Sequence, residues 1–361
     1  MNTYPRVEID LKKLRQNIDE TVTICHEKNI SVVGVIKGVS GIPACIKEYE
    51  ESECDYIGTS RLEQIERAVG RGRSKPWMLI RVPMLSEVED VVRLTEISLN
   101  SEVAVLEALN REALYRGKLH KVVLMVDLGD LREGFWDEKE LLEAADLVEN
   151  KMDGLTLFGV GTNLGCYGSV AATPEKMNEL ILHAEAVESK IGRPLEMISG
   201  GATTSFPLVM NGKMPARINN VRLGETILLA KDLVDLYGYD MSFMNQDVFI
   251  LKAEVIELKV KPSYPVGELT FDAFGHVGTY VDRGMRKRAL LALGRVDVPS
   301  TASLIPVNDH IQVVGASSDH WIVDVEDCKI PLKVGDLVEF YLCYESLVFA
   351  THSPNVKMVI K

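Results

Sequence analysis

The feature that most constrains this chain is a repeated alternation of a short apolar run with a helix-like segment. Each of eight such runs precedes a segment with helical spacing, and the runs cover residues 30–37, 55–60, 77–83, 96–101, 122–129, 156–165, 195–201 and 219–230. Repeated strand–helix units imply a parallel sheet, and eight at this spacing fit a closed (β/α)8 barrel, the TIM-like fold. A doubly wound open sheet is the alternative, but no early G-x-G-x-x-G motif supports a dinucleotide site.

The pattern changes after about residue 240, where β-branched and aromatic residues alternate with little helical period. Such stretches cover residues 246–264, 288–298, 310–327, 336–350 and 356–361. They predict an all-β C-terminal domain, so that residues 1–238 form the barrel domain and residues 239–361 the β domain. An amphipathic helix at 8–29 precedes the first barrel run, which leaves residues 4–10 free to add a strand to the β domain.

Composition narrows the class of protein. The chain has 361 residues and a formal net charge of −13, whereas a nucleic-acid-binding surface is normally basic. No apolar run approaches the roughly 20 residues of a membrane-spanning helix. The six cysteines are scattered, without a CxxC pair or a histidine at metal-ligand spacing. We therefore expect a cytoplasmic protein with reduced thiols, no metal site, and no nucleic-acid or membrane partner.

The first apolar run, VVGVIKG, ends in a single lysine, Lys37. A run of this length closed by glycine is typical of a strand buried on both faces, and lysine is almost never buried without a partner. Lys37 is therefore either an exposed strand end or an amine delivered into a pocket at the carboxyl end of the barrel. The carboxyl ends of barrel strands are where such folds keep their chemistry.

The other strand ends favour an anion-binding pocket. These strand ends contribute polar side chains and one glycine whose backbone N–H is available. The residues are Ser60, Arg61, Arg81, Asp127, Arg132, Asn163, Ser199, Gly200, Thr203, Thr204 and Arg222. The stretch SGGATTS (199–205) offers backbone N–H groups and hydroxyls that suit a phosphate, with Gly224 at the next strand end, although such loops are often only turns. An amine beside a phosphate nest is what pyridoxal 5'-phosphate requires.

The segments EIDLKKLRQNI, VIKGVSG, YIGTSRLEQIERA, MVDLGDLREGF, SGGATTSF and NNVRLGETI occur in this order. Together they resemble the alanine racemase family of fold-type III pyridoxal-phosphate enzymes, in its alanine/ornithine racemase branch. The resemblance covers nearly the whole chain. It implies that Lys37 attaches the cofactor and acts as the base on one face of the substrate's α-carbon. It also implies that Arg222 contacts the pyridine nitrogen and that Arg132 reaches the phenolic oxygen.

Further matches and departures follow from the same resemblance. Thr203 or Thr204 and Gly224 match phosphate contacts, and Asn163 falls where the family often has a histidine under the ring. Three family tyrosines are absent: the residues at their positions are Gly41, Arg295 and Pro354. One of these tyrosines, replaced by Arg295, is the second catalytic base, which the partner subunit donates in the family.

Racemisation needs an acid/base group on each face of the α-carbon. Asp319 and His320 in ASSDH (316–320) are the leading candidates for the second group, with a hydrogen-bonded turn as the alternative interpretation. His276 and Tyr344 are further candidates. A cationic substrate side chain needs a carboxylate, for which Asp319 is again a candidate, together with Asp297 and Glu225.

The resulting expectation is a homodimeric pyridoxal-phosphate amino-acid racemase for ornithine, with lysine or other basic amino acids as further substrates and with each site completed by the partner subunit. An alanine or broad-specificity racemase is the first alternative. A diamino-acid decarboxylase and a non-catalytic protein of pyridoxal-phosphate homeostasis are the others.

Overall fold

The computed structural model describes residues 3–68 and 74–361, and the chain divides into two compact units. One unit is Lys12–Asn245, and the other combines Met1–Leu11 with Gln246–Lys361. The boundary predicted between residues 238 and 239 lies shortly before this division.

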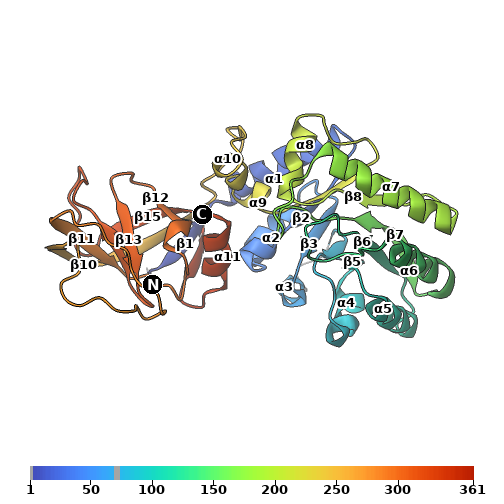
Figure 1. Ribbon diagram of the computed structural model, residues 1–361, viewed down its shortest axis with the longest axis horizontal. Coiled ribbons are helices and arrows are strands. Elements are labelled where there is room, and N and C mark those ends of the chain that lie inside the picture. The colour runs from blue at the N-terminus through green and yellow to red at the C-terminus, as the bar shows by residue number, and fades with distance from the viewer. Residues whose placement is uncertain (1–2, 69–73) are drawn as a thin grey trace. The chain divides into compact units, whose positions relative to one another are not determined.

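The first unit is a closed barrel of eight parallel strands, which confirms the predicted fold (Figure 1). Neighbours in the barrel are consecutive in the chain, and β9 closes the ring by pairing with β2. The strands are β2 Ser31–Val35, β3 Tyr56–Thr59, β4 Trp77–Leu79, β5 Ile97–Asn100, β6 His120–Met125, β7 Leu155–Gly161, β8 Met197–Ser199 and β9 Asn220–Leu223.

The helices of this unit are α1 Leu11–His26, η1 Lys37–Val39, α2 Pro43–Glu50, α3 Leu62–Glu66, η2 Leu85–Glu87, α4 Val88–Leu94, α5 Val103–Tyr115, α6 Glu138–Lys151, α7 Pro174–Ile191, η3 Thr203–Ser205, α8 Phe206–Met210, α9 Glu225–Leu228 and α10 Asp232–Asp235. The pattern at 61–72 predicts the helix observed as α3, and its residues 69–72 lie outside the described residues. Local chemistry fixes several ends: the Asp137 carboxylate accepts from the Lys139 amide at 2.7 Å to begin α6, and Gly192 ends α7 at a φ of 78°. Within the described part of the chain, none of the helices combines the length and the apolar character that crossing a bilayer requires.

The two sides of β2 have different partners. Val33 and Val35 belong to a fully buried cluster with residues of the other barrel strands, among them Met125. Side chains alternate along a strand, so Gly34 faces the opposite way, toward Tyr49 of α2. A Cβ on Gly34 would lie 2.5 Å from Tyr49 Cδ1, so the ring occupies the place of a side chain.

Gly34→Ala should therefore destabilise the barrel by about 1–3 kcal/mol through overpacking against a rigid, fully buried ring. The unfolding midpoint in urea, followed by circular dichroism, measures the change. Gly315→Ala is the matched control because a Cβ there meets nothing within 4 Å. Equal midpoints for the two variants would contradict this account of the packing.

The second unit is a mostly antiparallel sheet in the order β12-β15-β10-β11-β14-β13. The first strand of the chain, β1, pairs antiparallel with β10 and parallel with β16. The strands are β1 Arg6–Ile9, β10 Phe249–Pro262, β11 Met285–Leu291, β12 Leu304–Pro306, β13 Gln312–Ala316, β14 Trp321–Asp324, β15 Leu337–Leu342 and β16 Lys357–Ile360, and a short turn of helix, η4 Thr301–Ser303, precedes β12.

One expectation for this unit is wrong: the β pattern predicted through residue 350 ends in a helix, α11 Tyr344–His352. The Ser346 hydroxyl accepts from the Cys343 amide at 2.9 Å and donates to the Ser303 carbonyl at 2.7 Å. Leu347 and Ala350 lie one turn apart and are fully buried. The cap and this apolar stripe override the strand propensity of the aromatic residues.

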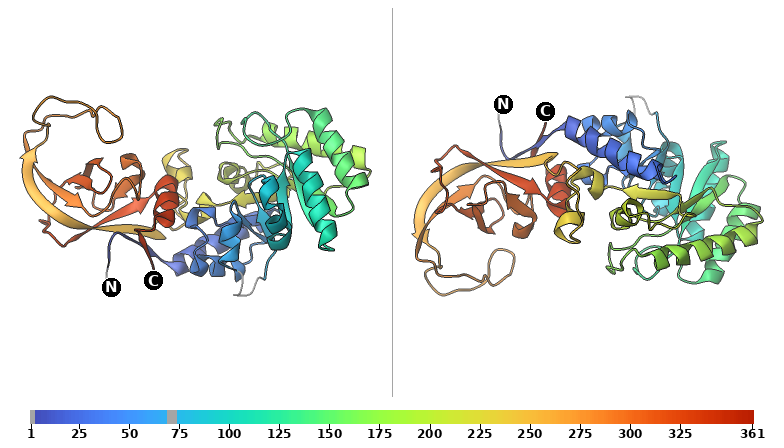
Figure 2. Two further views of the ribbon diagram at one scale, coloured as in Figure 1. Left: turned by 90° about the horizontal axis from the view of Figure 1, so that it is seen from below. Right: turned by 90° about the horizontal axis from the view of Figure 1, so that it is seen from above.

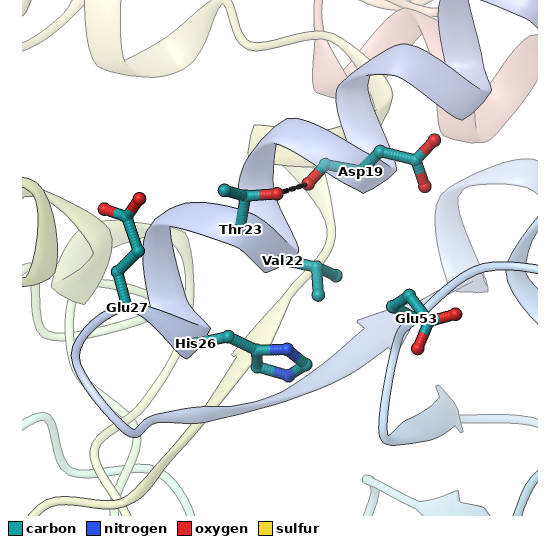
Figure 3. Close-up of a pocket in the computed structure, with 6 residues that line it drawn as sticks. All are labelled: Asp19, Val22, Thr23, His26, Glu27 and Glu53. Carbon is teal, nitrogen blue, oxygen red and sulfur yellow. Dashed lines mark hydrogen bonds between the residues drawn. The ribbon is translucent and has the colours of Figure 1, made fainter.

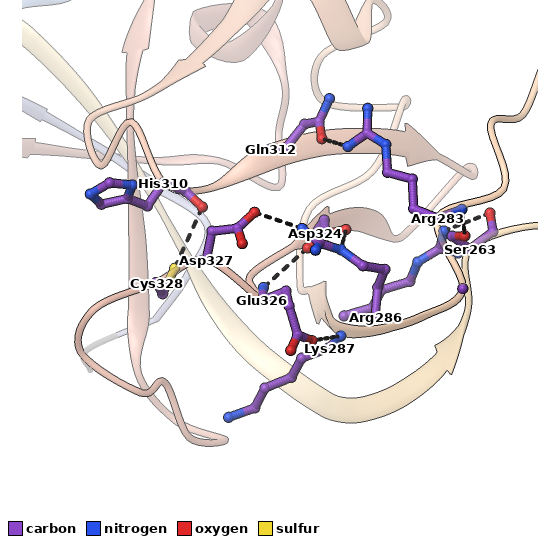
Figure 4. A network of polar contacts seen from close by, with 12 residues as sticks. Ser263, Arg283, Arg286, Lys287, His310, Gln312, Asp324, Glu326, Asp327 and Cys328 are labelled. Atoms are coloured by element: carbon purple, nitrogen blue, oxygen red, sulfur yellow. Dashed lines mark hydrogen bonds and ion pairs between the residues drawn. The ribbon is translucent and has the colours of Figure 1, made fainter.

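A polar network joins β11, β14 and the segments that follow them (Figure 4). Arg286 bridges Asp324 at 2.9 Å and Asp327 at 2.6 Å. Arg283 Nη1 donates to Gln312 at 2.5 Å, at the end of the connection from β10 to β11 that Figure 2 shows curling away from the sheet. These contacts tie the end of the long connection and the start of β11 to β13, β14 and the segment after β14.

Candidate active site at the carboxyl end of the barrel

Lys37 follows β2 directly, in the 3-10 turn η1. It continues the series of Val33 and Val35, whose side chains fill the barrel interior, so the fold carries the amine to the carboxyl end of the barrel. Burial lowers the pKa of Lys37, and Arg132 and Arg222 lower it further, while Cys166 and Glu133 act in the opposite direction. In the described residues the Lys37 amine has no hydrogen-bond or ion-pair partner. A lowered pKa makes the amine more readily deprotonated and hence a better nucleophile.

Arg222 of β9 is buried beside this amine and is held by the barrel itself. Its Nη1 donates to Ser199 Oγ at 2.5 Å and its Nη2 to the Thr162 carbonyl at 2.7 Å. The Ser199 hydroxyl donates in turn to Asn220 Oδ1 at 2.5 Å. Burial lowers the pKa of Arg222 to about 10, which still leaves the guanidinium charged at neutral pH. Ser199, expected to contact a phosphate, instead orients Arg222 from within the barrel wall.

Arg132 lies in the loop after β6 and forms a bidentate ion pair with Glu133. Its Nη2 donates to Glu133 Oε1 at 2.6 Å, and its Nε pairs with Oε2. The pair is partly exposed, so Arg132 remains accessible at the barrel mouth. Arg132 and Glu133 both act electrostatically on Lys37, which places the predicted arginine in the same site.

Asp130, which the sequence did not single out, fixes the two loops that carry Arg132 and Asn163. Its buried carboxylate accepts backbone N–H groups from the loop after β7 at 2.9–3.2 Å, those of Gly165, Cys166, Tyr167 and Val170. These bonds hold the pKa of Asp130 below its usual value despite its burial. The clamp brings Cys166 into electrostatic range of Lys37. Nothing in the sequence spacing signals that Asp130 binds a loop some 35 residues away.

The glycine- and threonine-rich turn after β8 supplies part of the expected anion cradle. The Thr203 hydroxyl accepts from the Thr226 amide at 3.3 Å and keeps its own proton for donation. The Thr204 hydroxyl already donates to the Leu164 carbonyl at 2.9 Å. Gly201 has a φ of +104°, and a Cβ there would lie 2.8 Å from Ser205 Oγ. Of the two threonines, Thr203 is thus the better donor to an anion.

Gly200, Gly224 and Asn163 complete the predicted set. A Cβ on Gly200 would lie 2.6 Å from Ile218 Cγ2, so this glycine allows the turn to pack on the segment before β9. A Cβ on Gly224 would lie 3.3 Å from Val35 Cβ, at the end of the neighbouring strand. Asn163 has a buried Nδ2 without a hydrogen-bond partner. An open buried donor of this kind is costly unless a ligand or water engages it.

Glu225 follows Gly224 and is buried. Its Oε1 accepts the amides of Lys231 and Asp232, both at 2.8 Å, while its Oε2 is buried without a partner. Burial, with the nearby Asp232 carboxylate, raises the pKa of Glu225 to about 7. Glu225 therefore caps the following turn and is about half protonated at neutral pH.

Three predicted candidates, Asp319, His320 and Asp297, belong to the β unit. Asp319 and His320 are exposed in the turn between β13 and β14, where the Ser317 amide donates to the His320 carbonyl at 2.8 Å. Asp319 accepts from the Ser318 hydroxyl at 2.7 Å. Asp297 is buried and binds Ser353, Asn355 and the Gly294 amide, which leaves it little capacity for a substrate amine.

A depression of about 310 Å³ elsewhere on the barrel unit is lined by Asp19, Val22, Thr23, His26, Glu27 and Glu53 (Figure 3). It lies on α1 and the segment before β3, whereas the barrel's chemistry lies beyond the carboxyl ends of the strands. Thr23 there donates only to the Asp19 carbonyl, at 2.8 Å. Neither here nor elsewhere in the described residues do three or more His, Cys, Asp or Glu side chains form a group that could hold a metal ion.

Comparisons with known proteins agree with this geometry. Residues 9–232 match the model of the alanine racemase N-terminal domain. The chain is 41% identical to an ornithine racemase of Acetoanaerobium sticklandii over 96% of both chains. It is 37% identical to a lysine racemase of Thermotoga maritima over 99% of this chain and 98% of that protein. The chain belongs to the alanine racemase family.

Solved structures of alanine racemases share this fold. The alanine racemase of Streptomyces lavendulae superposes with a TM-score of 0.76 at 17% identity, covering 100% of this chain and 98% of that one. Both units, and not the barrel alone, are therefore shared with that structure.

Glu225→Gln should stabilise the protein in a pH-dependent way. The folded-state pKa of about 7 lies above the ordinary glutamate pKa of 4.5, so the stability that Glu225 contributes is present below pH 4.5 and is lost as the pH rises through 7. Glutamine keeps the acceptor for Lys231 and Asp232 without a charge. We expect the variant to be more stable than wild type at pH 8 by about 1–3 kcal/mol and equal to it near pH 4.5, as measured by denaturant unfolding. A difference that does not change with pH would contradict the buried-carboxylate account.

Asp130→Ala should release the loop of residues 165–170 and destabilise the barrel by about 1–3 kcal/mol, because backbone N–H groups lose a charged acceptor. Hydrogen exchange measured by mass spectrometry should rise in that loop specifically. Asp153→Ala, at an exposed position of the same unit, is the control and should change neither quantity. Unchanged protection of residues 165–170 would show that Asp130 does not hold the loop.

Proposed function

We propose that this protein is a pyridoxal-phosphate-dependent racemase that interconverts L- and D-ornithine, with lysine and other basic amino acids as further substrates. The observation that carries the proposal is the Lys37 amine at the carboxyl end of the barrel: burial lowers its pKa, and Arg132 and Arg222 lie within electrostatic range. The ornithine and lysine racemases, both similar over nearly their whole length, support the substrate class.

The residues present fit the cofactor. Lys37 would attach it, Arg222 would face the pyridine nitrogen, and Arg132 would reach the phenolic oxygen. Thr203 and the backbone at Gly224 would hold the phosphate, and the open buried amide of Asn163 offers a further donor. When bound, pyridoxal phosphate supplies a conjugated system that spreads the negative charge left by the departing α-proton.

The chain's own residues then decide which reaction follows. Lys37, whose pKa is lowered mainly by burial, can take the proton from the α-carbon on its side. Arg222 stays charged, so it donates hydrogen bonds without transferring a proton. Ser199 and the Thr162 carbonyl fix the direction in which Arg222 points. The site is thus built to move a proton at the α-carbon.

The proposed substrate class rests on the absence of three tyrosines that the family resemblance places in the pocket. Gly41, Arg295 and Pro354 stand where the family resemblance places tyrosines, which leaves room for a side chain longer than that of alanine. The terminal amine of ornithine needs a carboxylate, for which Glu225 and Asp319 remain candidates, whereas the contacts of Asp297 disfavour it. The proposal includes a homodimer in which the partner completes each site. All six cysteines are free thiols, which supports a reducing compartment such as the cytoplasm.

Lys37→Ala should abolish both cofactor attachment and turnover. Wild-type protein incubated with pyridoxal phosphate and dialysed should be yellow and should convert L-ornithine to a racemic mixture, followed by chiral chromatography. The variant should be colourless and slower by about 10³-fold or more, because covalent attachment and one proton-transfer group are lost together.

Lys139→Ala, an exposed lysine of the same unit, is the control and should behave as wild type. Release of carbon dioxide from L-ornithine would indicate a decarboxylase instead. A yellow protein that turns over neither ornithine nor lysine would contradict the proposed substrate class.

A further inference from the structure

The connection between β10 and β11, residues 263–284, forms a long exposed arm (Figure 2). Its root is fixed: the Ser263 amide donates to the Gly284 carbonyl at 2.9 Å, and Arg288 donates to the Ser263 carbonyl at 2.8 Å. Beyond the root, large apolar side chains face solvent; they are Tyr264, Val266, Leu269, Phe271, Phe274, Val277, Tyr280 and Val281. Val266 is 89% exposed and Phe271 70%. A contiguous apolar arm of this kind marks a surface that another molecule covers.

The tip of the arm is built around one aspartate. The Asp272 carboxylate accepts the amides of Phe274 and His276, both at 2.8 Å, and its Oδ1 lies 3.6 Å from His276 Nδ1. Arg295 holds the tip from the sheet side: its Nη1 lies 3.6 Å from Asp272 Oδ2, and its guanidinium lies 4.4 Å from the centre of the Phe274 ring. The backbone bonds from His276 and Phe274, together with the charge of Arg295, hold the pKa of Asp272 below its usual value. The His276 ring is thus an exposed imidazole beside an ionised carboxylate.

This arrangement gives Arg295 a purpose other than proton transfer. An arginine cannot act as a general base, because its guanidinium does not give up a proton in proteins. Here Arg295 also donates through Nε to the Pro299 carbonyl at 3.0 Å, so that it ties the tip of the arm to the sheet. Arg295 therefore supports the Asp272 carboxylate, which in turn lies beside His276.

We infer that His276, oriented by Asp272 and delivered by the arm of a second copy of this chain, is the second proton-transfer residue of the barrel site. The inference rests on the proposed racemase function and goes beyond it by assigning this residue. Histidine is the side chain most often used for proton transfer near neutral pH, and a carboxylate partner orients its ring.

Two observations favour a second copy as the occupant. The barrel site holds the buried guanidinium of Arg222 and the accessible one of Arg132, which is paired with Glu133, whereas residues 263–284 carry three carboxylates against one arginine. The site is also incomplete within the barrel unit, since a racemase needs a group on each face of the α-carbon and Lys37 serves only one. The arm offers an acidic, apolar surface and the missing group together.

The proton balance is closed. In one direction Lys37 takes the α-proton and His276 gives a proton to the opposite face; in the other direction the roles are exchanged. No bond to a heavy atom forms or breaks at the α-carbon. After each turnover one of the two groups has gained a proton and the other has lost one. Both return to their starting protonation by proton exchange with water.

The other candidates lack this combination. Asp319 is bonded to Ser318, and no carboxylate hydrogen bond or ion pair orients His320 among the described residues. Cys166 belongs to the barrel, on the loop that Asp130 fixes near Lys37. These three residues serve as the competing assignments in the test.

The test is solvent-deuterium incorporation at the α-carbon, started separately from L- and D-ornithine, in wild type and His276→Gln. The variant should lose exchange from one enantiomer by about 10²-fold or more, should keep exchange from the other near the wild-type rate, and should no longer racemise. His310→Gln, an exposed histidine beside an aspartate in the same unit, is the matched control and should keep both exchanges. Loss of one-face exchange in His320→Gln, Asp319→Asn or Cys166→Ser, but not in His276→Gln, would overturn the assignment.

Delivery from a second copy is tested with a purified heterodimer of one Lys37→Ala chain and one His276→Gln chain, each carrying a different affinity tag. If the arm acts between chains, one of the two sites has both groups and the heterodimer should recover about half of the wild-type activity. If His276 acts within its own chain, both sites are incomplete and the heterodimer should be inactive, which would overturn this part of the inference.

Sedimentation velocity of the cofactor-free protein provides a readout without catalysis. Val266→Asp and Phe271→Asp should shift the protein from dimer toward monomer, because a charge would be buried at the interface. Ile330→Asp, 80% exposed in the same unit, should remain dimeric. A monomeric wild type, or arm variants that stay dimeric, would contradict the inference. Wild type that fails to racemise any basic amino acid would instead defeat the proposed function, so the two failures are distinguishable.

Discussion

The burial of one amine is the constraint on which the rest of the site depends. Taking Lys37 out of water disfavours its charged form, and the two neighbouring arginines act in the same direction. A carboxylate bonded to the amine would have reversed this effect. Instead, the carboxylate of Glu133 is paired with Arg132, and that of Asp130 is spent on backbone amides. Both carboxylates therefore lie near the site, but neither is bonded to the Lys37 amine.

Each charged group near the site has its own structural support. Arg222 is fixed through Ser199 and Asn220, which belong to the barrel wall, and Asp130 ties together the loops after β6 and β7. Such supports matter because a group that transfers or directs a proton must be held to within a fraction of an ångström. In the β unit, Arg295 and Asp272 give His276 a comparable support on an otherwise exposed arm.

Part of this could be predicted from the sequence. The eight apolar runs correspond to β2–β9, and Lys37 and Arg222 lie at the barrel end where the strand order places them. Other parts could not. The stretch at 336–350 has strand-like composition, but the Ser346 cap and the buried Leu347–Ala350 stripe make its second half a helix. The hydroxyls of Ser199 and Thr204 suggest phosphate contacts, but each is engaged by a neighbouring strand or loop.

The sequence by itself determined the barrel, the β unit and the presence of an amine at a strand end, because hydrophobic periodicity and chain order are local properties that every neighbouring residue reinforces. Only the tertiary structure decided what each polar group does. The direction in which the pKa of Lys37 shifts, whether Ser199 faces a ligand or Arg222, and whether Asp130 binds a distant loop depend on burial and on partners far away in the chain. Those contacts form only when the strands close into a ring, and no spacing in the sequence encodes them.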